Sequence, residues 1–271
     1  MTIRIGVAGA AGRMGRMLLQ AVSDSDLDVA LVAATVRPGS ELAGGDVSSL
    51  VGNKSQGVAL SDDLAAVLSD LDVLIDFTPP EAALVHAKLC GEQGVALVSG
   101  TTGFSPEQAQ AFEAATEGVA LCCSANFSTG VNLAYKLLAQ AAAVLDAEAD
   151  VEIAESHHRH KVDAPSGTAL AMGEVVASAR GVSLPEVAEF DRVQHSGPRA
   201  PGSIGFSVTR AGDIVGDHTV VFATPGERLE ITHKASSRMA FARGAVRAAH
   251  WVAGREPGRY DMQDVLGLKE S

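Results

Sequence analysis

Five residues near the middle of the chain, from His157 to Lys161, form its densest group of side chains that can exchange protons. Three of them are histidines, which titrate near neutral pH, and a lysine ammonium can donate a proton, so the group suits general acid–base catalysis. A basic run is more often a solvated face that only attracts anions. Two neighbouring features favour a catalytic site here. A strand-like segment at 151–154 precedes the run, and a loop that turns into a helix follows it.

Ser166, Gly167 and Thr168 stand where that helix is predicted to begin. The first N–H groups of a helix have no partner within the helix and lie at the positive end of its dipole, so they attract anions. A substrate with carboxylate groups would be held there and by the neighbouring Lys and His side chains. The sequence therefore predicts a site for a negatively charged substrate beside a proton donor.

A second group of residues, close to the start of the chain, has the small side chains that a phosphate site needs. Gly9, Gly12 and Gly15 follow the spacing GxxGxxG, rather than the commoner GxGxxG, between the first predicted strand and the first predicted helix. Small residues there let backbone N–H groups approach a pyrophosphate. Such turns also occur without a ligand, but the position after the first strand of a βαβ series favours a dinucleotide. Arg13 adds a cation within reach of phosphate.

The end of the second predicted strand, at 29–34, bears on the choice of dinucleotide. An acidic residue commonly binds the ribose 2′-hydroxyl of NAD at that point, and the sequence has none there. Arg37 could instead meet the 2′-phosphate of NADP, although a surface arginine in a turn before Pro38 explains it nearly as well. We expect a nicotinamide cofactor, NADPH or NADH, with NADPH favoured.

Two further loops follow apolar strands directly. One contains Phe77 and Thr78, and the other contains Gly100, Thr101 and Thr102. In open α/β sheets the carboxyl ends of the strands line the binding crevice, so both loops are candidates to contact a ring or a ribose. Ordinary turn chemistry would explain either loop taken alone.

The first half of the chain alternates short apolar runs with helical patterns. Runs that are apolar on both faces are typical of parallel strands with helices on each side. The strands are expected at 3–8, 29–34, 73–77, 95–99 and 119–122, and the helices at 13–22, 81–90 and 106–115. This order predicts a Rossmann-like, doubly wound parallel sheet.

The pattern changes after about residue 126. A long helix is expected from Ser128-Thr129 onward, and the segments 204–209 and 228–232 alternate apolar and polar residues, as strands with one buried face do. We therefore predict a second, α+β domain built on a largely open mixed or antiparallel sheet. The expected boundaries are 1–127 for the dinucleotide-binding domain and 128–237 for a domain that binds substrate and forms oligomers. A helical C-terminal segment, 238–271, is expected to complete the first domain.

Composition excludes several classes of protein. The chain has 271 residues with 21 Lys+Arg against 33 Asp+Glu, a formal net charge of −12, which argues against a nucleic-acid binder. No apolar run approaches the roughly 18 residues that a membrane helix needs. The beginning of the chain turns glycine-rich where a signal peptide would be apolar, and three cysteines form no disulfide framework. We expect a cytoplasmic protein that binds neither membranes nor nucleic acid.

Metal and thiol chemistry are both disfavoured. His157 and His160 are close in sequence, but a loop does not fix them as a ligand pair and no matching set of cysteines or carboxylates accompanies them. Cys123 ends an apolar strand, where thiols are usually buried and inert. We therefore expect no metal and no cysteine nucleophile.

The segment 155–169 resembles the signature of the dihydrodipicolinate reductase family. That signature reads E-x-H-H-x-x-K-x-D-A-P-S-G-T-A, and every fixed position of it is matched here. The resemblance extends over nearly the whole chain, and it is carried elsewhere by the segments 9–15, 76–78, 99–104, 125–128, 210–213 and 233–238. The long signature is highly specific, whereas the glycine loop alone is not.

The resemblance implies a reaction and a role for each matched residue. Members of this family use NADH or NADPH to reduce 4-hydroxy-tetrahydrodipicolinate, with loss of water, in the diaminopimelate route to lysine. The resemblance also implies that the protein is a homotetramer. His157 would then be the acid–base residue and Lys161 the proton donor, while His158, Ser166, Gly167 and Thr168 would bind substrate. The cofactor would contact Gly9, Ala10, Ala11, Gly12, Arg13, Met14, Arg37, Phe77, Thr78, Gly100, Thr101, Thr102, Ser124, Ala125, Asn126 and Phe127. Relatives often have an acidic residue where Val36 stands, so this position leaves the cofactor preference open.

Two alternatives remain at this stage. Another Rossmann-type NAD(P) oxidoreductase would share the glycine loop but would not require the run from 157 to 169. An NAD(P)H-sensing binding module would need no catalytic group, so steady cofactor turnover would exclude it.

Overall fold

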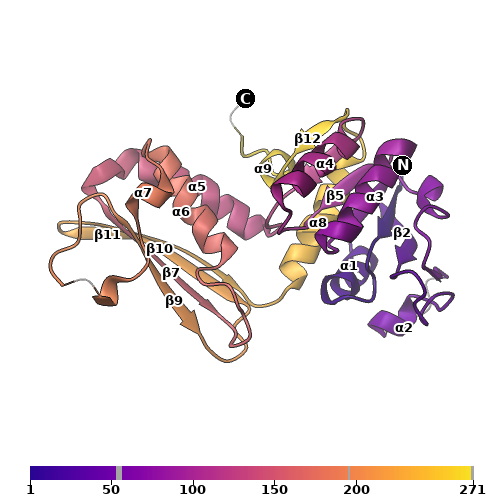
Figure 1. Cartoon of the computed structure of the whole chain (residues 1–271), viewed down its shortest axis with the longest axis horizontal. Coiled ribbons are helices and arrows are strands. Elements are labelled where there is room, and N and C mark those ends of the chain that lie inside the picture. Colours follow the sequence, from indigo (N-terminus) through magenta and orange to yellow (C-terminus); the bar gives the residue numbers. More distant parts are fainter. Residues whose placement is uncertain (53–56, 195, 270–271) are drawn as a thin grey trace. The chain divides into compact units, whose positions relative to one another are not determined.

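The computed structural model describes residues 1–52, 57–194 and 196–269, and it divides into two compact units. The first unit consists of Met1–Thr129 together with Arg238–Ser271, and the second is Gly130–Ser237. Each unit has a sheet and a buried core of its own (Figure 1). Within the described residues, no helix is both long and apolar enough to cross a membrane.

The described residues of the first unit form a seven-stranded parallel sheet in the order β12-β6-β5-β4-β1-β2-β3. Its strands are β1 (Ile3–Val7), β2 (Val29–Thr35), β3 (Leu60–Ser61), β4 (Val73–Asp76), β5 (Ala96–Ser99), β6 (Ala120–Cys123) and β12 (Gly258–Tyr260). Five of these match the predicted apolar runs to within a residue. The sequence pattern missed β3 and β12, because two or three residues are too few to show a period.

Helices cover both faces of this sheet. They are α1 (Arg13–Ser23), α2 (Ser48–Val51), α3 (Pro80–Gln93), α4 (Pro106–Thr116), α8 (Met239–Val252) and α9 (Met262–Val265). Alternate residues of β4 point into different cores: Ile75 packs in the cluster that contains α1 and α8, and Leu74 packs in the cluster that contains α3 and α4. The strands are therefore buried on both sides, and the predicted doubly wound fold is confirmed.

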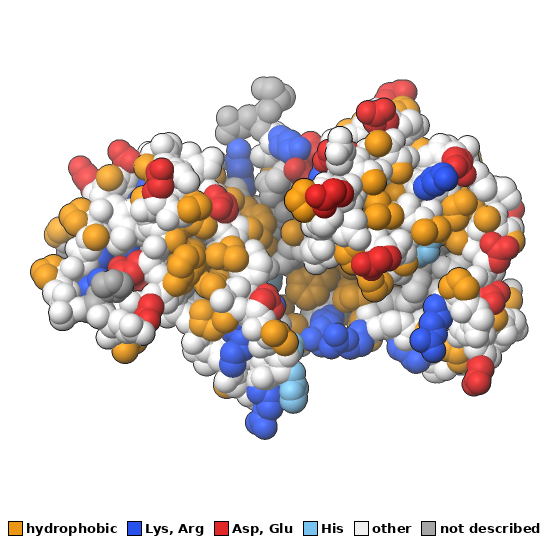
Figure 2. All heavy atoms as spheres, viewed as in Figure 1, with side chains coloured by type: hydrophobic (Ala, Val, Ile, Leu, Met, Phe, Trp, Pro, Cys, Tyr) orange, Lys and Arg blue, Asp and Glu red, His pale blue; other side chains and the backbone are white. Residues whose placement is uncertain are grey.

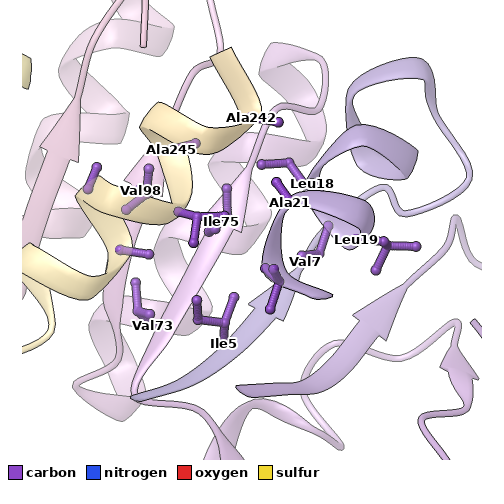
Figure 3. Packing of buried hydrophobic residues seen from close by; sticks show 14 of the residues in the cluster. Ile5, Val7, Leu18, Leu19, Ala21, Val73, Ile75, Val98, Ala242 and Ala245 are labelled. Carbon is purple, nitrogen blue, oxygen red and sulfur yellow. The ribbon is translucent and has the colours of Figure 1, made fainter. Parts of the chain in front are cut away.

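The C-terminal segment supplies one wall of the larger core. Figure 3 shows Ala242 and Ala245 of α8 facing Ile75 and Val98 of the sheet. Position 244 must be glycine, because a Cβ there would overlap the backbone carbonyl of Phe127. Residues 270–271 of the expected segment 238–271 lie outside the described residues.

The described residues of the second unit form a five-stranded mixed sheet in the order β11-β10-β7-β9-β8. Its strands are β7 (Asp150–His157), β8 (Ala188–Glu189), β9 (Ile204–Arg210), β10 (Gly216–Thr224) and β11 (Glu227–Ala235). Strand β10 is antiparallel to both of its neighbours, β11 and β7, whereas β7, β9 and β8 run parallel to one another. The predicted mixed sheet is confirmed.

Helices α5 (Thr129–Leu145), α6 (Gly167–Ala179) and α7 (Leu184–Val187) lie on one side of that sheet (Figure 1). Ile153 and Phe222 of the sheet pack there against Leu138 and Met172 of the helices. The edge strand β11 differs from expectation, because most of it is exposed and Leu229 is only partly covered. An edge strand has one strand neighbour, so fewer side chains are available to cover it.

Candidate active site

A cavity of about 480 Å³ lies in the first unit at the carboxyl ends of β1, β2 and β4. This size is within the usual range for small-molecule sites. Of the predicted cofactor residues, those on its wall are Gly9, Ala11, Gly12, Arg37, Phe77 and Thr78, and the wall also includes Thr35, Val36, Pro38, Ser40, Leu42, Pro79, Ala82 and His86. The glycine loop and the end of the second strand therefore meet at one cavity, as the sequence pattern suggested.

The glycines of the first loop are required by space as well as by backbone angle. Gly9 has a φ of +64°, and a Cβ on it would lie 2.8 Å from Cγ2 of Thr78. A Cβ on Gly15 would overlap the carbonyl of Gly9, so this glycine allows α1 to pack close to the loop. Arg13 is exposed at the first position of α1, where its side chain is available to an anion.

The other predicted cofactor residues lie at the adjoining strand ends. Gly100 contacts the ring of Phe77 so closely that a Cβ would overlap it, and Phe77 packs against Phe127 with ring centroids 5.3 Å apart. Thr101 Oγ1 donates a hydrogen bond to the carbonyl of Thr78 at 2.9 Å, and the Ser124 N–H donates to Ser99 O at 3.3 Å. The ends of β4, β5 and β6 are thus tied together. Ala10 is buried and Met14 packs on the core, whereas Thr102 and Ala125 are exposed.

One polar atom on the cavity wall marks it as a binding site. The Oγ1 of Thr78 is buried and has no hydrogen-bond partner among the described residues. Buried polar groups are nearly always paired, so a lone hydroxyl at a cavity fits a ligand that supplies the partner. None of the described residues that line the cavity is Asp or Glu, and the cation Arg37 is among them. The cavity therefore suits a ligand that carries negative charge and a hydrogen-bonding group.

His86 belongs to this cavity and was missed in the sequence. Its Nδ1 lies 2.8 Å from Oδ2 of Asp76, a carboxylate that is 1% exposed, and the Thr78 N–H donates to the other oxygen at 2.7 Å. The pair fixes both the ring and the loop. Ala82 and His86 are four residues apart on α3, so helical spacing could have placed them on one face.

In the second unit, His157 is the last residue of β7 and is buried. The strand was expected to end at 154, before the basic run, and that expectation was wrong. Alternation along β7 places Glu155 and His157 on the same face, and His157 Nδ1 lies 2.6 Å from Glu155 Oε2. Arg210, on neighbouring β9, donates to both carboxylate oxygens at 2.8 Å. Burial alone would raise the pKa of Glu155, but the hydrogen bonds from Arg210, His157 and Ser166 lower it below its usual value.

Ser166 caps the helix that follows. Its Oγ accepts from Ala169 N–H at 3.2 Å, and its own N–H donates to Glu155 Oε1 at 3.0 Å. Gly167 and Thr168 are the first residues of α6, and the space around the Gly167 α-carbon is open. The side chain of Ser166 is thus used for capping, while the helix start beside it can receive an anion.

His218 of β10 joins the site from a part of the sequence that was not singled out. Its Nε2 lies 3.0 Å from Ser166 Oγ, and its ring stands edge-on to that of His157 with centroids 5.1 Å apart. Burial is the main cause that lowers the pKa of His218 to about 4, and electrostatic repulsion from His157 adds to it. Strand alternation places His218 on the same face as Val220 and Phe222, which is the signal that could have found it.

The rest of the basic run lies in the loop beyond β7. Lys161 Nζ is 2.9 Å from Asp163 Oδ2, and the Lys161 N–H donates to His158 O at 3.1 Å. Burial would raise the pKa of Asp163, but the hydrogen bond from Lys161 lowers it. Arg159 and His160 are exposed. Figure 2 shows basic and histidine side chains gathered at the end of this unit where β7 and β9 finish.

Two further groups that could do chemistry are the possible metal ligands and the three cysteines, Cys90, Cys122 and Cys123. No group of three or more His, Cys, Asp or Glu side chains that could hold a metal ion occurs among the described residues. Burial raises the pKa of Cys90 and of Cys122 to about 12, and it also raises that of Cys123. These thiols are therefore poor nucleophiles at neutral pH.

Comparisons with known proteins cover the entire chain. Two family models match, "Dihydrodipicolinate reductase, N-terminus" over residues 3–127 and "Dihydrodipicolinate reductase, C-terminus" over residues 130–266. The chain is 57% identical to the 4-hydroxy-tetrahydrodipicolinate reductase of Saccharophagus degradans over 269 residues, 99% of this chain and 100% of that protein. It is 56% identical to the protein of the same name from Alkalilimnicola ehrlichii, over 99% of this chain and 100% of that one.

Solved structures agree in fold. A dipicolinate-bound dihydrodipicolinate reductase from Paenisporosarcina sp. TG-14 superposes with a TM-score of 0.76 and 26% identity, over 97% of this chain and 99% of that one. An amine dehydrogenase from Mycobacterium smegmatis superposes with a TM-score of 0.63 at 17% identity, over 96% of this chain and 94% of that one, and shares the fold alone.

Proposed function

Because the chain belongs to the dihydrodipicolinate reductase family, we propose that it reduces 4-hydroxy-tetrahydrodipicolinate, with loss of water, to tetrahydrodipicolinate. It is an NAD(P)H-dependent oxidoreductase of the diaminopimelate route to lysine, and the resemblance seen in residues 155–169 is confirmed. The observation that carries this conclusion is the high identity to reductases of that name over the full length of the chain.

The second unit has the groups that a dianionic substrate requires. The start of α6, at Gly167 and Thr168, can bind a carboxylate through its first N–H groups, and Lys161 adds a positive charge in the loop before it, where His158 also lies. In a protein with net charge −12, this local basic group is what attracts an anion. We assign substrate binding to the domain 128–237, with Ser166 holding the helix start in place.

The reaction requires proton transfer at two points. The hydroxyl group must gain a proton to leave as water, and hydride addition to the conjugated C=C–C=N system leaves negative charge that must be neutralised. We assign His157 as the acid–base residue and Lys161 as the donor whose ammonium neutralises that charge. Asp163 holds Lys161 Nζ at 2.9 Å, which fixes the ammonium within the loop between β7 and α6.

The first unit has a cavity that fits the cofactor. When bound, the reduced nicotinamide supplies the hydride. The lone hydroxyl of Thr78 and the open helix start after Gly12 suit a ribose and a pyrophosphate, and Arg37 suits a 2′-phosphate. We therefore assign cofactor binding to the domain 1–127, completed by 238–271, and infer that NADPH binds at least as tightly as NADH.

We also infer a homotetramer assembled through the second unit. Its sheet has helices against one face, while Ala154, Thr219 and Val221 on the other face are exposed or half-buried. These three side chains are small and uncharged, so this part of the face can receive a sheet of another copy. A cytoplasmic location suits the three cysteines, which are free thiols in the described structure.

A coupled assay tests the function. The substrate is made in situ from pyruvate and aspartate semialdehyde by the synthase that precedes this step, and loss of reduced nicotinamide absorbance is followed after addition of the protein and NADPH. Rapid loss that requires both the synthase and this protein is the expected result, and it also excludes a module that only senses NAD(P)H. No loss with either cofactor, from folded protein that still binds NADPH, would leave a different Rossmann oxidoreductase or the sensor.

A further inference from the structure

We propose that Glu155, clamped by Arg210, is a positioning residue that holds His157 with its proton on Nδ1, so that Nε2 is the nitrogen that exchanges protons in the reaction. The proposal rests on the proposed function only in giving His157 a role in proton transfer. Its structural content, the state of the His157 ring, is independent of which substrate binds.

The contacts of Glu155 carry the argument. Its carboxylate is almost completely buried and receives four hydrogen bonds: two from Arg210, one from the Ser166 N–H and one on the side of His157. A carboxylate in the ionised state only accepts hydrogen bonds. Arg210 is always protonated, and its two bonds, together with that from the Ser166 N–H, favour the ionised carboxylate. The nitrogen of His157 that faces Glu155 must therefore be the donor.

The opposite side of the ring packs closely against a glycine. A Cβ at position 216 would lie 2.9 Å from His157 Nε2. The φ of Gly216 is not in the left-handed region, so the glycine there is required for space rather than for backbone conformation. Nε2 thus lies against the backbone of Gly216, and a side chain at that position would displace the ring.

The other charged and titratable groups around His157 do not compete for this role. His218 of β10 is neutral at working pH, since its pKa is about 4, and its Nε2 contacts Ser166. His233 of β11 stands opposite His218, and burial lowers its pKa too. Lys161 in the loop is paired with Asp163. Glu155 is therefore the charged partner that His157 contacts directly.

Without Glu155, the ring loses the contact that selects its tautomer. A partner on one ring nitrogen determines which nitrogen carries the proton and how the ring is oriented. In a neutral ring protonated on Nε2, the basic nitrogen would be Nδ1, so Nε2 could not take up the proton that it passes on in the reaction. The orientation would also relax, and proton transfer would slow even though the substrate could still bind at the start of α6.

The substitution Glu155→Gln tests this, with Glu152→Gln as the matched control. Glu152 is on the same strand and is also paired with an arginine, Arg199 at 2.9 Å, but it points to the opposite face. For Glu155→Gln we expect kcat to fall about 10²-fold, the lower end of what acid–base groups contribute, with little change in the KM for substrate. Glu152→Gln should keep the wild-type kcat, compared at the wild-type oligomer size because Glu152 lies on the face that we assign to assembly.

A spectroscopic measurement decides the same question without a variant. Nitrogen-15 spectra of the wild-type protein labelled at histidine, with His157→Gln used to assign the signal, should show His157 protonated on Nδ1 at neutral pH. A proton on Nε2 instead would overturn the proposal, and so would a Glu155→Gln enzyme with wild-type kcat. If Glu155→Gln does not fold, the wild-type spectrum gives the answer. If the wild-type protein shows no reductase activity, the proposed function fails, while the spectrum still tests the state of the ring.

Discussion

The substitution Thr78→Val should make the cofactor-free protein more stable and should lower its affinity for the cofactor. Thr78 Oγ1 is buried without a hydrogen-bond partner among the described residues, and it lies on the wall of the cofactor cavity. Valine keeps the Cγ2 methyl group that packs beside Gly9 and replaces only the hydroxyl. The same change therefore removes an unsatisfied group from the free protein and a hydrogen-bonding group from the complex.

The two effects can be sized separately. A buried hydroxyl without a partner costs about 1–3 kcal/mol, so we expect the free energy of unfolding to rise by about 1 kcal/mol, or the Tm by about 2–4 °C. A net hydrogen bond contributes about 0.5–1.5 kcal/mol, so the Kd for NADPH should rise about two- to tenfold. Opposite signs for stability and affinity are unusual for one substitution, which makes the prediction specific.

Thermal unfolding without cofactor and calorimetric titration with NADPH measure the two effects. Thr101→Val is the matched control, because the hydroxyl of Thr101 does have a partner, the carbonyl of Thr78 at 2.9 Å. Its loss should lower the free energy of unfolding by about 1 kcal/mol. A lower Tm for Thr78→Val, or an unchanged Kd for NADPH, would refute the assignment of the lone hydroxyl to the ligand.

Four further predictions concern the site. His157→Ala and Lys161→Ala should each lower kcat by about 10²-fold or more, the usual loss with a proton-transfer residue, and wild-type kcat in steady-state assays of both would contradict their roles. Calorimetry should show NADPH binding at least as tightly as NADH, with the advantage lost in Arg37→Ala; a clear NADH preference in the wild type would refute this. Thr168→Val should mainly raise the KM for substrate, and an unchanged KM would mean that the start of α6 is structural. The protein should lose stability as the pH falls from about 6.5 to about 4. In that range His218 binds a proton in the unfolded chain, but not in the folded protein, where its pKa is about 4. Denaturant titrations should show that the stability of His218→Gln depends less on pH.

The strands of the first unit could be predicted because burial on both faces makes them continuously apolar. Ile75 and Leu74 face different cores, yet both are apolar, so β4 appears in the sequence as an uninterrupted run. The short strand β12 gives no such signal. Its place beside β6 follows from the packing of α8 on the sheet, which depends on residues far from it in sequence.

The extent of β7 and the identity of its partners could not be predicted for a related reason. Glu155 and His157 continue the buried face of the strand with polar side chains, so the apolar pattern stops at 154. What allows them to be buried is Arg210, which is 55 residues away and becomes a neighbour only through the pairing of β7 with β9. Sequence patterns indicate the proton-handling residues themselves, whereas the groups that orient them depend on strand pairing.

The packing of α8 in the first unit has a consequence for how the chain is made. During synthesis, residues 1–129 leave the ribosome before the segment that covers α1 and the middle of their sheet exists. Ala242 and Ala245, which pack against Ile75 and Val98, are synthesised only after the whole of the second unit has been translated. The second unit has a core of its own and can fold as soon as it emerges. The second unit can therefore complete its core before the larger core of the first unit is complete.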